Sequence, residues 1–192
     1  MTQLYTPYQG ENIGLDFSAT DPPSELVSSQ DVVDRMDLVD TEDEEILASQ
    51  IKAVRVFLEA FTGMTLCKAK TITAYWRGHA YRLPLPFSPI TSVTSVTRIY
   101  GETGAETLLT VSTDYWVEGV KEKSVHFNSV QAGYGVKVIY IAGLTDPATI
   151  ELVRDAILSE VTYWYQNKID EDDFNYDIGR IAKKKLLHFR QW

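Results

Sequence analysis

The order of its predicted elements constrains this chain most. Two long amphipathic helices, predicted at 41–62 and from 147 onward, are separated by residues 63–146, where strand and turn signals dominate. Each helix carries an apolar stripe that the other helix, a sheet or another copy of the chain has to cover. This order is typical of a component of an assembly and favours that class over an enzyme.

Composition and cysteine usage narrow the class of protein. A chain of 192 residues with 44% hydrophobic and 11% aromatic residues can bury a substantial core. The one cysteine, Cys67, excludes an intrachain disulfide and is best interpreted as a small buried hydrophobe. No secretion signal begins the sequence, and the longest apolar run, 138–144, is too short to span a bilayer. We therefore expect a cytosolic protein that is not inserted in a membrane.

The net charge of −9 is distributed unevenly. Residues 1–62 contain 13 Asp and Glu against 3 Lys and Arg, whereas residues 63–192 contain 14 against 15. Residues 178–192 contain five basic residues and no acid. An acidic protein is a poor candidate for wrapping duplex DNA, since affinity for phosphates grows with the number of neutralising cations. Acidic walls would instead repel DNA, which suits a conduit.

The amino-terminal third predicts an arm followed by two helices. Residues 1–25 show no helical or strand period, which indicates an extended arm. A short helix is expected at 28–38, with Ser28 or Ser29 as its N-cap. The long helix at 41–62 should begin with a capping box of Thr41 and Glu44 and end at Gly63. Its apolar stripe comprises Leu47, Ile51, Val54, Leu58 and Phe61, with Ile46 and Phe57 widening it.

The middle of the chain predicts six to seven short strands in a twisted sheet or small sandwich. Segments 71–77 and 79–85 flank Gly78 and suggest a hairpin. Prolines within 84–89 place that stretch at an edge or between sheets. Further strands are expected at 90–100, 106–111, 114–119, 123–128 and 135–143, because these segments are rich in β-branched and aromatic residues.

Two helices are expected after the strands. Asp146 is a good N-cap and Pro147 a good first residue for the second long helix. A last short helix should lie within 177–192, with Ile181, Leu186, Leu187 and Phe189 as candidate docking residues. The stripe of the long helix comprises Ile150, Val153, Ile157, Val161 and Trp164, flanked by Tyr163 and Tyr165.

No motif carries catalytic or metal chemistry. His79, His126 and His188 are scattered without metal-ligand spacing, and the acids at 170–173 lack the pattern of a calcium loop. The glycines at 101–104 and 133–135 are not part of a phosphate-binding loop and are interpreted as turns. We therefore predict no enzyme activity, no catalytic residues, no metal and no cofactor.

Several segments together resemble the head-tail connector (adaptor) family of long-tailed bacteriophages. They are EDEEILASQIKAVRVFLEAFTGMTL, ending at Phe61, Thr62 and Gly63; LPLPFSPITSVTSV, at 83–96; and VIYIAGLTDPATIELVRDAILSEVTYWYQN, followed by LLHFRQW. The resemblance covers residues 28–192, and the order of these motifs is more specific than any one of them.

The resemblance implies an α+β fold in which a small helical bundle contains an inserted antiparallel β domain. The expected parts are an extended arm at 1–27, a helical core at 28–66 and 147–178, a β domain at 67–146 and a basic tail at 179–192. The family is not enzymatic. Its members form a twelve-fold homo-oligomeric ring in the virion neck, beneath the portal, where DNA passes without specific binding, and they provide a platform for a head-closure or tail-completion protein. Such a protein would be made in the cytoplasm of the host bacterium.

Residue roles follow as hypotheses. In that family the carboxyl-terminal segment reaches into the portal, so removal of 179–192 should abolish portal binding and leave the fold intact. Glu42, Glu44 and Glu45 are the predicted channel-facing acids. The predicted portal-docking residues are Arg180, Lys183, Lys184, Lys185, Leu186, Leu187, Phe189, Arg190 and Trp192.

Two alternatives remain open. A small enzyme is the weaker one, because no nucleophile and base can be assembled from the motifs. The other is a tail- or neck-associated binding module that uses the β domain as an exposed platform. The aromatic residues of that platform would be Tyr75, Trp76, Tyr81, Tyr115 and Trp116.

Overall fold

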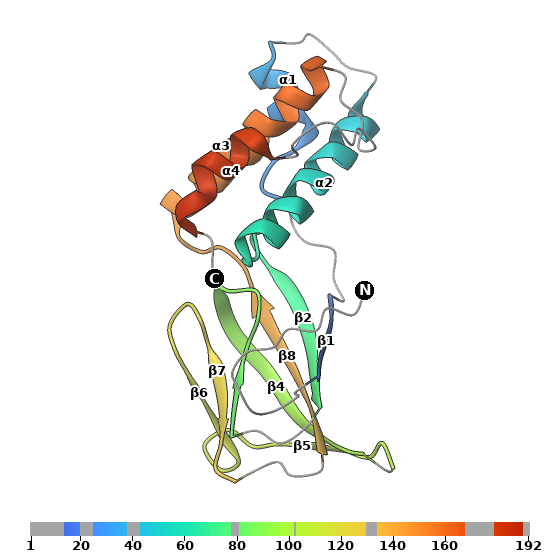
Figure 1. Ribbon diagram of the computed structural model, residues 1–192, viewed down its shortest axis with the longest axis vertical. Coiled ribbons are helices and arrows are strands. Elements are labelled where there is room, and N and C mark those ends of the chain that lie inside the picture. Colours follow the sequence, from blue (N-terminus) through green and yellow to red (C-terminus); the bar gives the residue numbers. More distant parts are fainter. Residues whose placement is uncertain are drawn as a thin grey trace. The chain divides into compact units, whose positions relative to one another are not determined.

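The chain divides into two compact units in the computed structural model (Figure 1). The β unit comprises Met1–Pro22 and Ala69–Gly143, and the helical unit comprises Pro23–Lys68 and Leu144–Trp192. The structure describes residues 14–19, 25–37, 43–77, 81–101, 103–129, 134–167 and 179–189. These residues form helices and antiparallel sheets, so the predicted α+β class is confirmed.

The helices of the helical unit lie where the sequence predicts them. They are α1 (Ser29–Arg35), α2 (Glu44–Thr62), α3 (Pro147–Asn167) and α4 (Arg180–Leu186), followed by the 3-10 helix η1 (Leu187–Phe189). Ser28 caps α1, since its hydroxyl accepts the backbone N–H of Asp31 while the Asp31 carboxylate accepts that of Ser28. Asp146 caps α3 in the same manner by accepting the N–H of Thr149 at 2.9 Å.

The ends of α2 confirm one expectation and correct another. Gly63 ends the helix in a left-handed conformation with φ 73°, as predicted. The predicted capping box is wrong, because the N-cap is Asp43 and Glu44 is the first helical residue instead of the third. Thr41 and Glu42 lie outside the described residues.

The apolar stripe of α2 is confirmed except at Ile46, and Phe57 packs against the core as predicted. Leu47, Ile51, Val54 and Leu58 are all buried in the core of the helical unit. Ile46 does not widen this stripe, because 52% of its surface is exposed. Each residue turns the helix by about 100°, which carries position 46 away from the direction set by Leu47.

The stripe of α3 covers the same core. Val153, Ile157, Val161 and Trp164 are buried, and Ile150 packs at the margin of the core. Segments from before α1 and from α4 complete it, so the core joins both ends of the helical unit. These further members are Leu26, Val27, Val32, Val33, Ala182 and Leu186.

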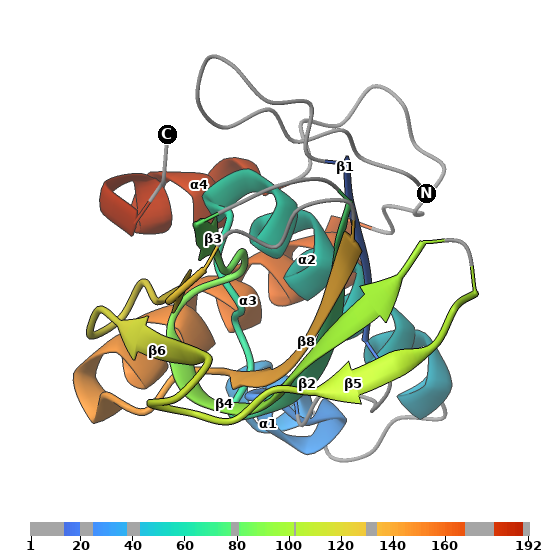
Figure 2. The same cartoon turned by 90° about the horizontal axis from the view of Figure 1, so that it is seen from below.

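The β unit contains two antiparallel sheets. The five-stranded sheet has the order β1 (Gly14–Ala19), β2 (Lys70–Arg77), β8 (Tyr134–Ala142), β4 (Ile90–Tyr100) and β5 (Glu106–Leu108). The three-stranded sheet has the order β3 (Arg82–Pro84), β7 (Ser124–Phe127) and β6 (Tyr115–Glu118). Figure 2 shows the long central strand β8 together with β2 and β4.

Pairing between strands differs from the prediction in two respects. The predicted hairpin around Gly78 is wrong, because β2 pairs with β1 and β8 whereas β3 pairs with β7. The predicted extended arm contains the strand β1, which adds an eighth strand to the six or seven expected. The partner of β1 lies more than fifty residues away in sequence, so no local period could reveal this pairing.

Alternating residues of β8 form the centre of the β core. Val136, Val138, Tyr140 and Ala142 are buried, while the residues between them are half-buried. Side chains from both sheets meet there, including Ile72 and Ala74 of β2, Val96 of β4, Leu83 of β3 and Val125 of β7. This packing makes the β unit a small two-sheet structure with one core.

Candidate assembly surfaces

The basic carboxyl-terminal segment is bound tightly to the helical unit by a buried glutamate. Glu160 of α3 has no exposed surface, and its carboxylate accepts the backbone N–H groups of Gly179, Ile181 and Ala182 at 3.0, 3.0 and 3.1 Å. The indole Nε1 of Trp164 donates to the same carboxylate at 3.1 Å. Because α4 has no side-chain cap of its own, Glu160 supplies the acceptors that its first turn needs.

Gly179 is suited to this junction in two ways. Its φ of 78° lies in the left-handed region, which other residues adopt at a cost. A Cβ atom at this position would also lie 2.6 Å from Cε1 of Phe57, too close for real atoms. Only glycine therefore lets the chain enter α4 against α2 without a shift of the aromatic ring.

Most of the predicted docking residues on α4 contact their own helical unit. Leu186 is fully buried, and Phe189 packs at the margin of the core. The Nζ of Lys183 lies 4.7 Å from the ring centroid of Phe57 and 5.8 Å from that of Phe61. Removal of 179–192 would take away core residues, so the expectation that such a deletion leaves the fold intact is wrong.

Lys185 belongs to a polar cluster between helices. Its Nζ lies 2.6 Å from Oδ2 of Asp155 and 2.9 Å from Oγ of Ser159. Arg35 of α1 contacts the same pair, at 3.1 Å from Asp155 and 3.2 Å from Ser159. The hydrogen bond from Lys185 is the main cause that lowers the pKa of Asp155 below its usual value, with Arg35 adding to it and partial burial opposing it.

Two of the predicted docking residues are exposed. Lys184 is exposed on α4, and 60% of the Leu187 surface is exposed on η1. Among the described side chains of α4 and η1, these two are the most accessible to a partner. The side chain of Arg180 and the whole of Arg190 and Trp192 lie outside the part that the structure describes.

The predicted channel acids lie at the first turn of α2. Glu44 and Glu45 are exposed there, and Glu42 lies outside the described residues. The backbone carbonyl of Glu44 accepts the hydroxyl of Ser29 at 3.3 Å, which ties this turn to α1. Both carboxylates therefore sit on a fixed helix end that is open to solvent.

A buried ionic network, absent from the prediction, holds the other end of α2. Arg55 is 2% exposed, and its Nε donates to the Glu25 carboxylate at 2.8 and 3.0 Å while Nη1 donates to Glu59 at 2.8 Å. Glu59 in turn accepts the backbone N–H of Leu66 at 3.0 Å. The network joins α2 to the segments on both sides of it.

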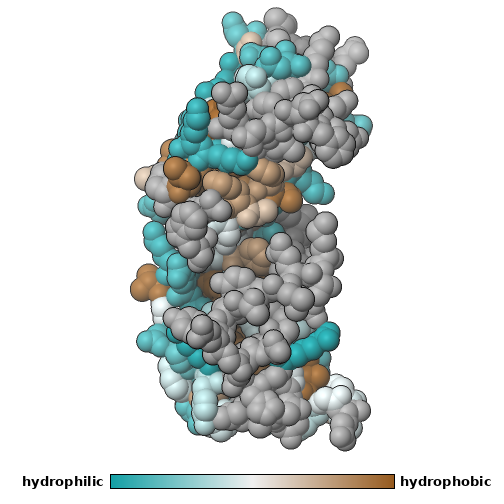
Figure 3. Space-filling view, viewed as in Figure 1, coloured by the Kyte–Doolittle hydropathy of each residue, from teal (hydrophilic) through white to brown (hydrophobic). Residues whose placement is uncertain are grey.

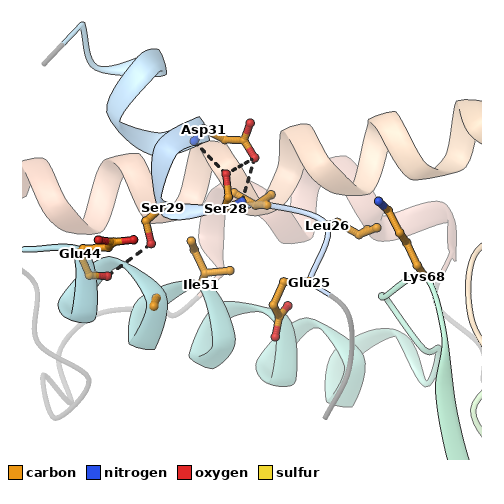
Figure 4. A pocket seen from close by; sticks show the side chains of 10 residues that line it. Glu25, Leu26, Ser28, Ser29, Asp31, Glu44, Ile51 and Lys68 are labelled. Carbon is orange, nitrogen blue, oxygen red and sulfur yellow. Dashed lines mark hydrogen bonds between the residues drawn. The ribbon is translucent and has the colours of Figure 1, made fainter. Parts of the chain in front are cut away.

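An open groove of about 520 Å³ lies between the segment before α1 and the side of α2 (Figure 4). Two of its carboxylates have partners, since Glu25 contacts Arg55 and Asp31 accepts hydrogen bonds from Ser28 and Arg154. Burial raises the pKa of Asp31, but the Ser28 and Arg154 contacts outweigh it and leave that pKa below its usual value. Both carboxylates therefore have structural roles, Asp31 in the cap of α1 and Glu25 as a partner of Arg55.

The aromatic platform predicted for the β unit is only partly exposed. Trp76 and Tyr115 are buried in the β core, and burial raises the pKa of Tyr115. Tyr75, Tyr81 and Trp116 are exposed, with Trp116 stacked on His126 at 5.2 Å between ring centroids. Three aromatics on different strands and loops are a smaller surface than the five expected.

The part of the chain that the structure describes contains neither a cluster of metal-ligating side chains nor a membrane-spanning helix. No group of three or more His, Cys, Asp or Glu side chains there is arranged to hold a metal ion. No helix among these residues has the length and apolar character needed to cross a membrane. Of the three histidines, only the His126 side chain is described.

Comparisons with known proteins give a structural likeness. No family model matches the chain, and no curated protein matches it. A chain in the neck of an empty gene transfer agent particle, computed with C6 symmetry, matches with a TM-score of 0.70 and 15% identity over 92% of this chain and 96% of that one. A chain in the virion of a native gene transfer agent particle matches with a TM-score of 0.70 and 13% identity, covering 92% and 95% of the two chains. The fold of this chain is thus that of a neck component of such a particle.

Proposed function

We propose that this chain is a structural protein of the neck of a tailed phage or phage-like particle, where it forms a ring beneath the portal. The observation that carries the proposal is the likeness to a neck chain over nearly the whole length of both chains. The likeness covers 92% of this chain and 96% of that one, so little of either chain lies outside the shared fold.

Ring formation agrees with the symmetry of that neck. A twelve-fold ring contains a six-fold axis, so a neck computed with C6 symmetry is compatible with either six or twelve copies. DNA would pass through such a ring without specific binding. The exposed carboxylates of Glu44 and Glu45 would suit a channel wall, since negative charge repels the phosphates.

Docking to the portal is assigned to the exposed part of the carboxyl-terminal segment. Lys184 offers a positive charge and Leu187 an apolar side chain to a partner. Further along the sequence, Arg190 is again cationic and Trp192 again apolar. Lys183, Lys185, Leu186 and Phe189 would instead hold this segment in the orientation that presents them. Such a pairing of an apolar anchor with a polar rim is usual at protein interfaces.

The test is assembly on the portal. The purified protein alone and mixed with its portal protein would be measured by light scattering and imaged by negative stain. We expect a closed ring on the portal. A protein that ignores the portal would remove the proposal and favour a binding module that uses the exposed aromatics of the β unit.

A pair of matched variants tests the docking residues. Lys184→Glu with Leu187→Asp should weaken portal binding, because it reverses the charge and removes the apolar contact. Val120→Asp with Lys121→Glu makes the same changes at exposed positions of the β unit and should bind normally. Equal binding by both double variants would show that docking lies elsewhere.

A further inference from the structure

Strand β5 is an edge of the five-stranded sheet, and no strand lies on its outer side in the part of the chain that the structure describes. It comes last in the strand order and lies beside β4 (Figure 2). All three of its residues are exposed, and Leu108 has 69% of its surface exposed. On the face that Figure 3 shows, apolar surface of the β unit forms small separate patches. A partner at this edge would therefore gain more from backbone hydrogen bonds than from a broad apolar contact.

Two residues of β5 direct their backbone groups outward. In an antiparallel pair, residues that exchange hydrogen bonds with the neighbouring strand alternate with residues that do not. The N–H of Leu109 donates to a carbonyl of β4 at 2.9 Å, and the carbonyl of Ala105 accepts an N–H of β4 at 3.0 Å. In this alternation Thr107 is bonded to β4, whereas Glu106 and Leu108 are not. The N–H and C=O groups of these two residues point away from β4 and are available to an added strand.

The charge at this edge is already balanced. Proteins often protect an exposed edge strand with charged side chains, which keep other strands away. Glu106 is the one charged residue of β5, and its carboxylate forms an ion pair with Lys137 of β8. The edge therefore suits an uncharged strand better than a charged one.

The directions of the strands limit what can join two sheets. Neighbouring strands are antiparallel throughout the sheet, so β1, β8 and β5 run one way and β2 and β4 the other. Neighbours in a closed ring are related by a small rotation, so at a joint between sheets β5 of one copy would face β1 of the next and run parallel to it. A strand of opposite direction placed between them would pair antiparallel with both, as every other pair in the sheet does.

Residues 1–13 supply a segment with the required direction. They precede β1 and lie outside the described residues. Gly10 and Asn12 are residues that favour a turn. A chain that turns there and then enters β1 runs antiparallel to β1 before the turn. The cross-strand pairs also place Gly14, where β1 begins, level with Glu106 of β5.

The sequence before this turn fits an added strand. Residues 1–10 contain no Asp, Glu, Lys or Arg, which suits the balanced edge. Residues 2–6 are Thr, Gln, Leu, Tyr and Thr, of which Thr and Tyr are enriched in strands. Pro7 lies just outside this stretch, so all five residues keep the N–H groups that strand pairing needs.

We infer that residues 2–6 of each copy form a strand between their own β1 and β5 of the next copy, and so join the five-stranded sheets around the ring. The inference rests on the proposed function, because it needs the head-to-tail contacts of a ring. Each copy donates one strand and receives one, so ring closure leaves none of these edges open.

Two substitutions at one position test the backbone contact. Leu108→Pro removes an N–H that β4 does not use, whereas Leu108→Ala removes the apolar side chain and keeps the N–H. Light scattering and negative stain of mixtures with the portal protein give the protein concentration at which rings form. We expect Leu108→Pro to raise this concentration at least tenfold and Leu108→Ala to raise it less than about threefold. Equal effects of the two variants would refute pairing through the backbone.

Deletion of residues 2–9 tests the added strand without any change in the described residues. The circular dichroism of the helical unit and the β unit should be retained, and the concentration needed for ring formation should rise at least tenfold. This variant keeps the inference testable if Leu108→Pro does not fold.

Cysteine cross-linking of rings on the portal shows whether the added strand binds its own β5 or that of the next copy. Leu108→Cys should form a linked dimer with at least one of Leu4→Cys and Tyr5→Cys, since one of two successive residues lies on the face of Leu108. Val120→Cys, at an exposed position outside the five-stranded sheet, is the matched control and should not link to either. The native Cys67 is buried, and the unsubstituted protein controls for it. Links that form only within a chain carrying both cysteines would overturn the inference.

These measurements separate the inference from the proposed function. Rings that form on the portal equally well without residues 2–9 would refute the joined sheets and leave the neck proposal standing. A wild-type protein that ignores the portal would refute the neck proposal, and the inference with it.

Discussion

Side chains join the elements of the helical unit, whereas backbone hydrogen bonds join those of the β unit. Helices satisfy their backbone groups internally, so contacts between helices have to come from side chains. In the helical unit these include the buried carboxylate of Glu160 and the buried guanidinium of Arg55. In the β unit the ladders of β2, β4 and β8 run over eight or nine residue pairs each.

This difference predicts which kinds of substitution destabilise each unit. A ladder distributes its hydrogen bonds over many residues, and the loss of one side chain leaves the others in place. A short helix such as α4 depends on a few acceptors, and the two carboxylate oxygens of Glu160 accept three backbone N–H groups at its entry. Single polar substitutions should therefore damage the helical unit much more than the β unit.

The largest expected effect is that of Arg55→Met. This change leaves the buried Glu59 carboxylate without its cation, and breaking a buried pair costs about 3–5 kcal/mol. The comparison is Lys137→Met in the β unit, which breaks the partly exposed contact with Glu106 and should cost no more than about 1 kcal/mol. Urea unfolding measures both, and equal losses would refute the contrast between the units.

The next effect in size is that of Glu160→Gln. An amide has one acceptor oxygen in place of two, so at least one N–H of the α4 entry loses its partner, at about 1–3 kcal/mol. Glu151→Gln, at an exposed position of the same helix, should change the free energy of unfolding by less than about 0.5 kcal/mol. Fluorescence of Trp164, which donates to Glu160, would follow the change. Equal stability of the two variants would mean that α4 does not need this cap.

The β unit provides the third comparison, in Tyr140→Phe. Its hydroxyl donates to the carbonyl of Pro86 at 2.8 Å, and burial raises the pKa of this phenol. Loss of this bond should cost about 1 kcal/mol, while the ladder of β8 remains. Tyr75→Phe removes an exposed hydroxyl and should be neutral. If Tyr140→Phe lowered the free energy of unfolding more than Glu160→Gln does, the β unit would be the more sensitive of the two units.

Local patterns in the sequence predicted the elements but not their partners. The apolar period of Leu47, Ile51, Val54 and Leu58 is set by residues within one helix, so it could be recognised directly. The pairing of β2 with β1 and β8 is set by residues far away in sequence. The sequence therefore predicted a hairpin from two adjacent strand segments around Gly78 that do not pair with each other. Helix and strand positions were therefore more predictable than strand order.

Which side chains are free to bind a partner was harder to predict, because this also depends on contacts between segments far apart in sequence. A basic helix with apolar residues has the same composition whether it packs on its own core or on a partner. The sequence therefore predicted docking for Lys183, Lys185 and Leu186, which contact their own helical unit in the structure. Glu160 gave a signal that was missed, since it lies among Ile157, Val161 and Trp164 on the apolar stripe of α3. An acid on a buried face requires donors, and these lie 19 to 22 residues further along the chain, at the entry to α4.

The smallest expected effect is a difference in acid sensitivity. The pKa of Asp155 is held below its usual value, mainly by the hydrogen bond from Lys185, so the ionised form is favoured more in the folded state than in the unfolded one. Its contribution is complete above the ordinary aspartate pKa of about 3.9 and is lost as the pH falls through the lower pKa of the folded state. Because Asp155 is half exposed, the effect should be small.

Asp155→Asn should therefore destabilise the helical unit slightly near neutral pH and reduce its loss of stability below about pH 4, as measured by urea unfolding at several pH values. An unchanged pH dependence in this variant would assign the acid sensitivity to other carboxylates, such as Asp31, whose pKa is also lowered.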